Sequence, residues 1–182
     1  MKKVFSSDLL ILICNLFLIN FGYAQLEPFG LPGKKINAIS LFSNFNIPSQ
    51  YYLYAGSDSN GVFLRELSSS DSVWVNHGLA GKKITSLHIY NWGVGPANIY
   101  SIFAGVRPNK FSGDSTLIYE RSYSGNWSSA DSGLNANTID QINAIGGFFF
   151  TGHAPPEPIF AANGSGIYRA IGFPPNLNWQ KV

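Results

Sequence analysis

The chain has 182 residues, in which 12 lysines and arginines face 10 aspartates and glutamates and leave a net charge of +2. Because no basic run is present, this balance excludes nucleic acid and anionic membranes as expected partners. Only 12% of the residues are charged, whereas 15% are aromatic and 19 are glycine, which is typical of a β-rich extracellular domain and not of a disordered chain. The single cysteine, Cys14, lies in an N-terminal leader, so the exported chain is expected to have no disulfide and no thiolate metal site.

The leader, residues 1–24, is predicted to be a secretory signal peptide. Lys2 and Lys3 precede an apolar run, Leu9–Leu18, and small residues stand at positions 22 and 24, where a signal peptidase reads the chain. The run is shorter than the roughly 20 apolar residues that span a membrane. We therefore expect cleavage near Gln25, no integral membrane segment afterwards, and a chain that is secreted or held at the cell surface.

Strand-like runs then follow one another, separated by clusters of Gly, Ser, Asn, Asp and Pro, and no stretch shows a sustained helical period. A first unit, residues 34–79, contains KINAISLF (35–42), YLYAGS (52–57), GVFLR (61–65) and a segment with Trp74. A second unit, residues 82–134, contains KITSLHIY (83–90), SIFAGV (101–106), LIYER (117–121) and Trp127. A third unit, residues 139–182, contains QINAIGGF (141–148), PIFAAN (158–163), GIYR (166–169) and Trp179. Four kinds of strand thus return in the same order three times.

The second strand of each unit carries small residues after an aromatic or apolar pair. Ala55-Gly56, Ala104-Gly105 and Ala161-Ala162 occupy these places. Small residues there let a strand lie close to neighbouring backbones. The units differ chiefly in three loops, 91–100, 107–115 and 150–158.

A repeat of about 50 residues with four strands per unit is the signature of a β-propeller blade. The expected fold class is therefore all-β, a β-propeller with about three four-stranded blades. Known propellers close with roughly 4 to 8 blades, so three units predict an incomplete ring, and roughly seven blades are expected in the complete one. Phe29-Gly30-Leu31 is interpreted as the end of an outer strand placed ahead of the first blade. The chain is expected to be the N-terminal part of a longer propeller or a truncated gene product.

These repeats also resemble a known group of proteins. The order aromatic-Ala-Gly, Gly-Val-Phe or Gly-Ile-Tyr-Arg, a Ser/Asp-rich turn into Trp, and Gly-Leu is similar to secreted bacterial propellers of the sialidase-type Asp-box class, which includes sortilin-like and photosystem-assembly-factor-like repeats. The resemblance covers Phe29 to Trp179. The turns SSDSVW (69–74), SYSGNW (122–127) and AIGFPPNLNW (170–179) depart from the family pattern Ser-x-Asp-x-Gly-x-x-Trp. Since that turn stabilises the fold in the family, the resemblance implies a repeat and does not by itself imply a catalytic site.

The candidate catalytic residues are three arginines and a set of carboxylates. Arg65, Arg121 and Arg169 recur at the end of the third strand; sialidase-like enzymes grip a carboxylate with three arginines, but a structural repeat also explains the recurrence. A glycosidase needs two carboxylates roughly 5 to 9.5 Å apart. No pair stands out by spacing, and turn formation accounts for the acidic residues. The candidates are Asp58, Asp71, Asp114, Asp131, Asp140, Glu66, Glu120 and Glu157.

Metal and cofactor sites are not expected. The histidines His77, His88 and His153 are too scattered for a zinc motif or a nucleophile triad. Asp58-Ser59-Asn60-Gly61 resembles the start of a calcium loop, but its glycine comes too early, and a hairpin turn is the better interpretation. Lys82 and Lys83 are interpreted as surface residues at a turn.

Aromatic residues next to the inserted loops are candidate binding residues. They either stack on sugars or anchor a protein partner, or they pack under their own loops. They are Tyr51, Tyr52, Trp92, Tyr100 and Phe148–Phe150.

The sequence therefore predicts an exported β-propeller that acts as a binding or scaffold module, with protein or glycan ligands and the remaining blades of a longer propeller as partners. The alternative is a carbohydrate-active enzyme, a sialidase or xyloglucanase-like glycosidase with catalytic carboxylates partly in missing blades. A third possibility is a passive spacer within a large surface protein. Fold alone does not separate these functions.

Overall fold

The structure, a computed structural model, describes residues 30–43, 49–69, 73–91, 100–122, 125–147, 158–172 and 176–182. The chain divides into two units, Met1–Pro32 and Gly33–Val182, and every strand belongs to the second unit. Within the described residues, no helix is long and apolar enough to cross a membrane. The predicted signal peptide lies outside the described residues, as do Asp71, Trp92, Phe148–Phe150, His153 and Glu157.

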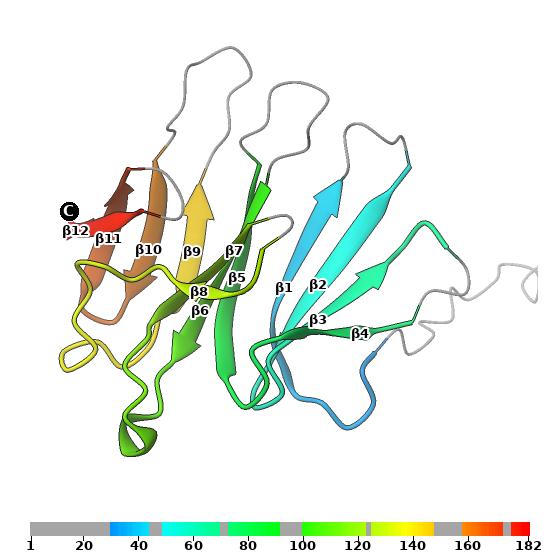
Figure 1. Ribbon diagram of the computed structural model, residues 1–182, viewed down its shortest axis with the longest axis horizontal. Helices are drawn as coiled ribbons and strands as arrows, with labels where there is room; N and C mark the ends of the chain where they lie inside the picture. Colours follow the sequence, from blue (N-terminus) through cyan, green and yellow to red (C-terminus); the bar gives the residue numbers. More distant parts are fainter. Residues whose placement is uncertain are drawn as a thin grey trace, which may run out of the picture. The chain divides into compact units, whose positions relative to one another are not determined.

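The described residues form three four-stranded antiparallel sheets, in each of which the strands follow chain order (Figure 1). The first sheet contains β1 (Ile36–Ser43), β2 (Tyr51–Ser57), β3 (Val62–Glu66) and β4 (Val75–Gly78). The second contains β5 (Lys83–Asn91), β6 (Tyr100–Arg107), β7 (Ile118–Ser122) and β8 (Ser128–Ser129), with a short 3-10 helix, η1 (Lys110–Ser112), between β6 and β7. The third contains β9 (Ala144–Gly147), β10 (Ile159–Asn163), β11 (Gly166–Ile171) and β12 (Asn178–Lys181). The prediction of an all-β chain with three four-stranded units is confirmed.

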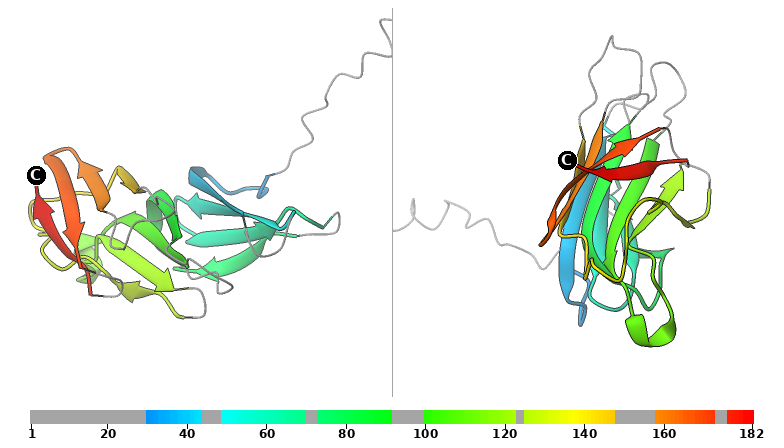
Figure 2. Two further views of the ribbon diagram at one scale, coloured as in Figure 1. Left: turned by 90° about the horizontal axis from the view of Figure 1, so that it is seen from above. Right: turned by 90° about the vertical axis from the view of Figure 1, so that its left-hand side faces the viewer.

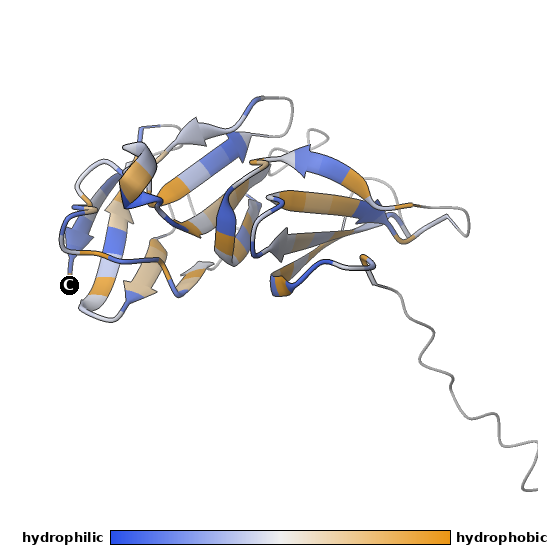
Figure 3. Ribbon diagram, turned by 90° about the horizontal axis from the view of Figure 1, so that it is seen from below, coloured by the Kyte–Doolittle hydropathy of each residue, from blue (hydrophilic) through white to orange (hydrophobic). Residues whose placement is uncertain are grey.

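The second sheet lies between the other two (Figure 2), because β5 contacts β1 and β2 on one side and β9 on the other. Every residue of β6 from Tyr100 to Val106 is buried, as expected for a strand that is covered on both faces. In β1 and β11, buried and exposed residues alternate along the strand. Figure 3 shows that hydrophilic and hydrophobic residues also alternate along many of the strands. Ile39 is 69% exposed, Leu41 is 60% exposed and Ile167 is 53% exposed. The first and third sheets therefore each present an outer face with exposed apolar side chains.

Two hydrophobic cores fill the two spaces between the sheets. The core between the first and second sheets contains Phe42, Tyr54, Val62, Ile84, Leu87, Tyr100, Ile102, Ala104 and Val106. The core between the second and third sheets contains Tyr90, Phe103, Leu117, Ile118, Ala130, Ile139, Ile142, Ile145, Ile159, Ala161, Tyr168, Ala170, Leu177 and Trp179. Burial of these side chains is the main favourable contribution to stacking.

The small residues of the second strands lie where consecutive sheets come closest. A Cβ atom added to Gly56 would lie 2.8 Å from the Cβ of Ile84 on the next sheet. A Cβ atom added to Gly105 would lie 2.9 Å from the Cβ of Ile142, just ahead of β9. Real Cβ atoms do not approach each other so closely, so glycine permits the packing of each sheet on the next, as the sequence predicted.

One hydrogen bond recurs between consecutive sheets. The indole Nε1 of Trp127 donates to the His77 carbonyl at 2.8 Å, and that of Trp179 donates to the Ala130 carbonyl at 2.7 Å. His77 follows Trp74 by three residues, and Ala130 follows Trp127 by three residues. Each tryptophan therefore reaches the carbonyl three residues after the preceding tryptophan, in β4 for His77 and directly after β8 for Ala130. We name this the indole contact.

Two predicted strands differ from those observed. Gly30 and Leu31, expected at the end of an outer strand, lie in no strand. β9 begins at Ala144, whereas the sequence predicted a strand from residue 141. Ile142 is fully buried between the second and third sheets, and its N–H donates to the Val106 carbonyl at 3.4 Å. This segment consequently follows the second sheet before it joins the third.

Replacing Gly56 by alanine should lower the free energy of unfolding by about 1–3 kcal/mol, because the added methyl group overpacks the space held by Ile84. Gly146→Ala is the matched control, since a Cβ at Gly146 in β9 meets nothing within 4 Å. Urea denaturation of both variants measures the difference. Equal stability of the two variants would contradict the proposed close approach.

Trp179→Phe should lower the free energy of unfolding by about 1–3 kcal/mol, because it leaves a buried carbonyl without its indole donor. Trp127→Phe should cost less, since that contact is only partly buried and Arg121 Nη1 also donates to the His77 carbonyl, at 3.0 Å. Thermal unfolding compares the two variants. A larger loss in Trp127→Phe would contradict this ranking.

Candidate functional site

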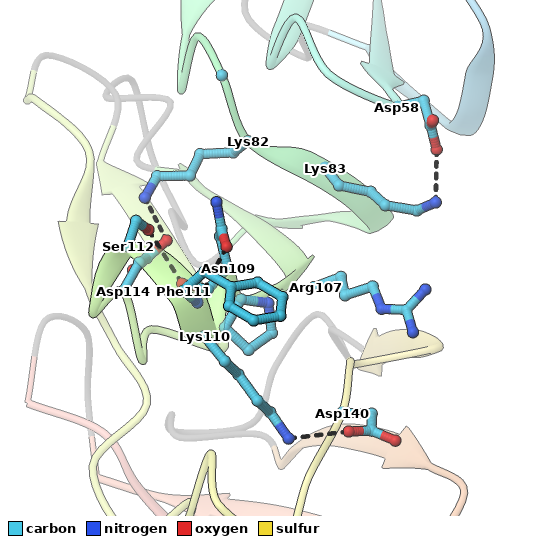
Figure 4. A pocket seen from close by; sticks show the side chains of 12 residues that line it. Asp58, Lys82, Lys83, Arg107, Asn109, Lys110, Phe111, Ser112, Asp114 and Asp140 are labelled. Carbon is cyan, nitrogen blue, oxygen red and sulfur yellow. Dashed lines mark hydrogen bonds and ion pairs between the residues drawn. The ribbon is translucent and has the colours of Figure 1, made fainter.

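A cavity of about 500 Å³ lies where connections from all three sheets meet (Figure 4). Asp58 comes from the β2–β3 turn, Lys82 and Lys83 come from the start of β5, and Asp140 precedes β9. Gly81 and residues of the segment 107–114, which runs from the end of β6 towards β7, supply the rest of the lining. The stacking of the sheets thus brings together residues that are up to 82 positions apart in the sequence.

A second cavity, of about 440 Å³, adjoins the first, because Arg107 and Asp140 line both. Its other lining residues are uncharged, and most carry amide or hydroxyl groups. They are Thr138, Ile139, Gln141, Asn143, Asn163, Gly164 and Ser165. We refer to the two cavities together as the groove.

Ion pairs hold the lysines of the first cavity. Four basic side chains and three carboxylates line this cavity, and each lysine is paired with one carboxylate. One positive charge, the Arg107 guanidinium, is left over. The ion pairs are Lys83 with Asp58 at 2.7 Å, Lys110 with Asp140 at 3.0 Å, and Lys82 with Asp114.

The lysines also set the protonation of the carboxylates. A hydrogen bond from Lys83, with a second from Asn37, holds the pKa of Asp58 below its usual range. A hydrogen bond from Lys110 holds the pKa of Asp140 below its usual range in the same way. Both carboxylates are therefore ionised over a wide pH range, which suits a charge partner and not a proton donor.

Arg107 and Phe111 are the most available side chains of the first cavity. Among the described residues, none forms a hydrogen bond or ion pair with the exposed Arg107 guanidinium, which Figure 4 shows between two of the lysine–aspartate pairs. Phe111 is fully exposed in η1. The Asn109 side chain accepts the Phe111 N–H at 3.1 Å, and Gly113, with φ of 75°, ends the turn. The turn consequently presents an apolar ring beside a cation.

The three candidate arginines do not share one repeat position. Tyr119 and Tyr168 are equivalent, because each pairs with the alanine of the second strand. In the first sheet, Phe63 pairs with Ala55 and is the equivalent residue. Arg65 stands two residues after Phe63, and Arg121 stands two residues after Tyr119, but Arg169 stands only one residue after Tyr168. A shift of one residue reverses the face of a strand, so Arg169 is exposed on the outer face of the third sheet. The predicted recurrence is wrong for Arg169, and none of the three arginines lines the groove.

The other described candidate carboxylates lie outside the groove. Asp131 accepts the Leu117 N–H at 2.7 Å, and Glu66 accepts the side-chain amide of Gln50 at 3.4 Å. Glu120 is buried between the second and third sheets; burial raises its pKa, and its Oε1 has no hydrogen-bond partner among the described residues. These carboxylates serve turns and packing.

The hairpin interpretation of Asp58–Gly61 is confirmed. The Ser57 N–H donates to the Gly61 carbonyl at 2.9 Å, and Gly61 has φ of 77°, which an L-residue rarely adopts. In the described ranges, no group of three His, Cys, Asp or Glu residues could hold a metal ion.

Two of the candidate aromatic residues belong to the core. The Phe42 ring lies 6.3 Å from that of Tyr52 and 4.2 Å from that of Tyr100, measured between ring centres. The hydroxyl oxygens of Tyr54 and Tyr100 lie 3.3 Å apart. Tyr51 is exposed. Tyr52 and Tyr100 therefore pack under neighbouring strands.

The described histidines are packing residues. The His77 ring lies 5.4 Å from the ring centre of Tyr54 and 6.5 Å from that of Trp127. Burial, together with the nearby charge of Arg121, lowers the pKa of His77 to about 4. Burial also lowers the pKa of His88. Both side chains are therefore neutral at pH 7.

Sequence reasoning missed the residues that make the groove. The interpretation of Lys82 and Lys83 as surface residues at a turn agrees with their partial exposure, but it does not reveal that both form ion pairs. Arg107 and Phe111 lie in the loop 107–115, which the sequence marked only as an insertion. The available signal was its length and polarity, because the first unit closes the same connection with the short turn Asp58–Gly61.

No protein-family model matches the sequence, and no curated protein and no solved structure matches it. The resemblance to the Asp-box class of propellers accordingly stays a prediction that rests on the repeat residues alone. The candidate site rests on the geometry of the described residues.

Stability should fall as the pH is lowered from about 6.5 towards 4. In this range His77 of the unfolded chain is protonated, whereas His77 of the folded chain stays neutral until the pH approaches its lowered pKa, so protonation favours the unfolded state. The contribution of His77 is complete above the unfolded pKa. His77→Phe keeps an aromatic ring against Tyr54 and Trp127 and should make the loss of stability between pH 7 and 5 shallower. Part of the loss should remain, because burial also lowers the pKa of His88. Melting temperatures across this range test the change, and identical pH profiles would contradict it.

Proposed function

We propose that the chain is part of an exported β-propeller that serves as a binding or scaffold module, with its three sheets as consecutive blades of a longer ring. The single observation that carries the proposal is the indole contact, which recurs with the same spacing and the same direction. The packing of β5 beside β1 and β9 adds support, since the first strands of propeller blades surround a common centre. Export is inferred from residues 1–24 alone.

The outer face of the third sheet favours a further blade beyond it. Phe160 occupies the position that Phe103 has on the second sheet, since each immediately precedes the alanine that pairs with the tyrosine of the third strand. Phe103 is fully buried in the core shared with the third sheet. Phe160 instead lines an open cavity of about 460 Å³ with Arg169 and Ile171. A next blade would cover these residues as the third sheet covers Phe103.

Binding is the role that the groove supports best. The general acid of a glycosidase needs a carboxyl group with a raised pKa. The two groove carboxylates with a shifted pKa, Asp58 and Asp140, have a lowered one, and the third, Asp114, pairs with Lys82. Glu120 has a raised pKa but does not line the groove. The alternative of a glycosidase gains no support from the described residues.

Residues 25–182 expressed alone should oligomerise or aggregate, because the apolar outer faces of the first and third sheets have no neighbouring blade. Light scattering coupled to size-exclusion chromatography measures the mass as a function of concentration. A monomer with one sharp melting transition would count against the incomplete ring.

A surface variant separates this explanation from general stickiness. Ile39→Lys combined with Leu41→Lys places charges on the outer face of the first sheet and should reduce association. Phe111→Lys is the matched control, since it also replaces an exposed apolar residue but lies in the groove. It should leave the mass unchanged. An equal effect of both changes would speak against association through the sheet faces.

A further inference from the structure

The groove has a single cation that is available to a ligand. Its three lysines form ion pairs with carboxylates of the chain, whereas the Arg107 guanidinium forms no hydrogen bond or ion pair with a described residue and acts only through its charge on Asp140, whose pKa it helps to lower. A guanidinium presents two parallel N–H donors that match the two oxygens of a carboxylate. One such group pairs with one carboxylate of a ligand.

The second cavity adds uncharged hydrogen-bonding groups. The Oδ1 of Asn163 accepts the N–H and the hydroxyl of Ser165, at 2.7 and 2.8 Å. Its Nδ2 is buried and has no hydrogen-bond partner among the described residues. Nearby, Gln141 donates to the Oδ1 of Asn143 at 2.6 Å, which fixes the Asn143 amide beside the same cavity. Oriented amide donors of this kind suit hydroxyl-rich ligands.

Phe111 supplies an apolar surface at the opposite end. Its ring is fully exposed, yet its backbone is fixed by the Asn109 side chain and by the turn at Gly113. Removing such a ring from water is favourable, and the apolar face of a sugar ring has a suitable shape and size. The order along the groove is therefore an aromatic ring, a cation and a set of amides.

We propose that the groove binds a polysaccharide of uronic acids, with Arg107 pairing with a carboxylate, Phe111 stacking on a sugar ring, and Asn143 donating to hydroxyl groups. This ligand class rests on the proposed binding role. It does not depend on a propeller ring, since every residue involved lies on, or in a connection between, the strands of the second and third sheets.

Isothermal titration of the purified chain with a short oligogalacturonate tests the proposal, and an alginate oligomer is the second probe. The methyl-esterified oligogalacturonate is the neutral comparison, because it keeps the hydroxyl groups and loses the charge. We expect binding of at least one acidic oligomer and affinity about tenfold weaker for the ester than for the acid. Equal binding of acid and ester, or no binding of either acidic oligomer, would overturn the proposal.

Variants assign the contacts. Arg107→Gln should weaken binding of the acid about tenfold and remove the preference over the ester. Phe111→Ala should weaken acid and ester alike. Arg169→Gln is the matched control, since it removes an exposed arginine outside the groove and should leave affinity unchanged. Equal losses in Arg107→Gln and Arg169→Gln would indicate general charge attraction and refute the site.

The outcome for ligand binding can be distinguished from the outcome for the incomplete propeller ring. A stable monomer that binds the acidic oligomer would refute the incomplete propeller and support the groove. An oligomer that binds neither acidic probe would do the reverse. Melting curves of each variant show whether a loss of affinity reflects a loss of fold.

Discussion

A four-stranded sheet in this chain carries apolar side chains on both faces, and only stacking on neighbouring sheets removes them from water. The middle sheet satisfies this requirement on both sides, which explains why β6 is buried along almost its whole length. Close stacking requires small residues, and Gly56 and Gly105 provide them. The indole contact then holds the last strand of each sheet at a fixed distance from the next sheet, because the carbonyl that accepts the indole N–H would otherwise lose its hydrogen bond.

The groove is a product of the same stacking. Its residues lie on turns and connections that have little structure in common, and they meet because the sheets place the ends of β2, β5 and β6 together. Lys83 with Asp58 links the second sheet to the first, and Lys110 with Asp140 links it to the segment that leads to the third. These pairs are partly or largely exposed, so their contribution is more to the arrangement of charge than to stability. What they leave for a ligand is one arginine beside one aromatic ring.

The strands and their grouping were predictable from sequence because the signals are local. Apolar runs, turn residues and the recurring tryptophans lie within each unit of about 50 residues. The position of Arg169 was not predictable in this way, because GIYR has one residue fewer than LIYER. Only the strand pairing shows that Tyr168 lies opposite Ala161, which places Arg169 on the other face of the sheet. The groove depends on contacts between residues as distant as Asp58 and Asp140, which no local pattern encodes. For the same reason Tyr52 and Tyr100, which flank a loop in sequence, are core residues in space.

The direction of the indole contact has a consequence for symmetry. Every donor belongs to the later sheet and every acceptor to the earlier one, so the two outer faces of the stack are chemically different. Association that repeats the indole contact is therefore heterologous, as a head joined to a tail. A two-fold dimer that uses one face twice would place two donor surfaces or two acceptor surfaces against each other. Units added to this stack have only two geometric outcomes, a closed ring when the rotation per sheet divides the circle and an open helical filament when it does not.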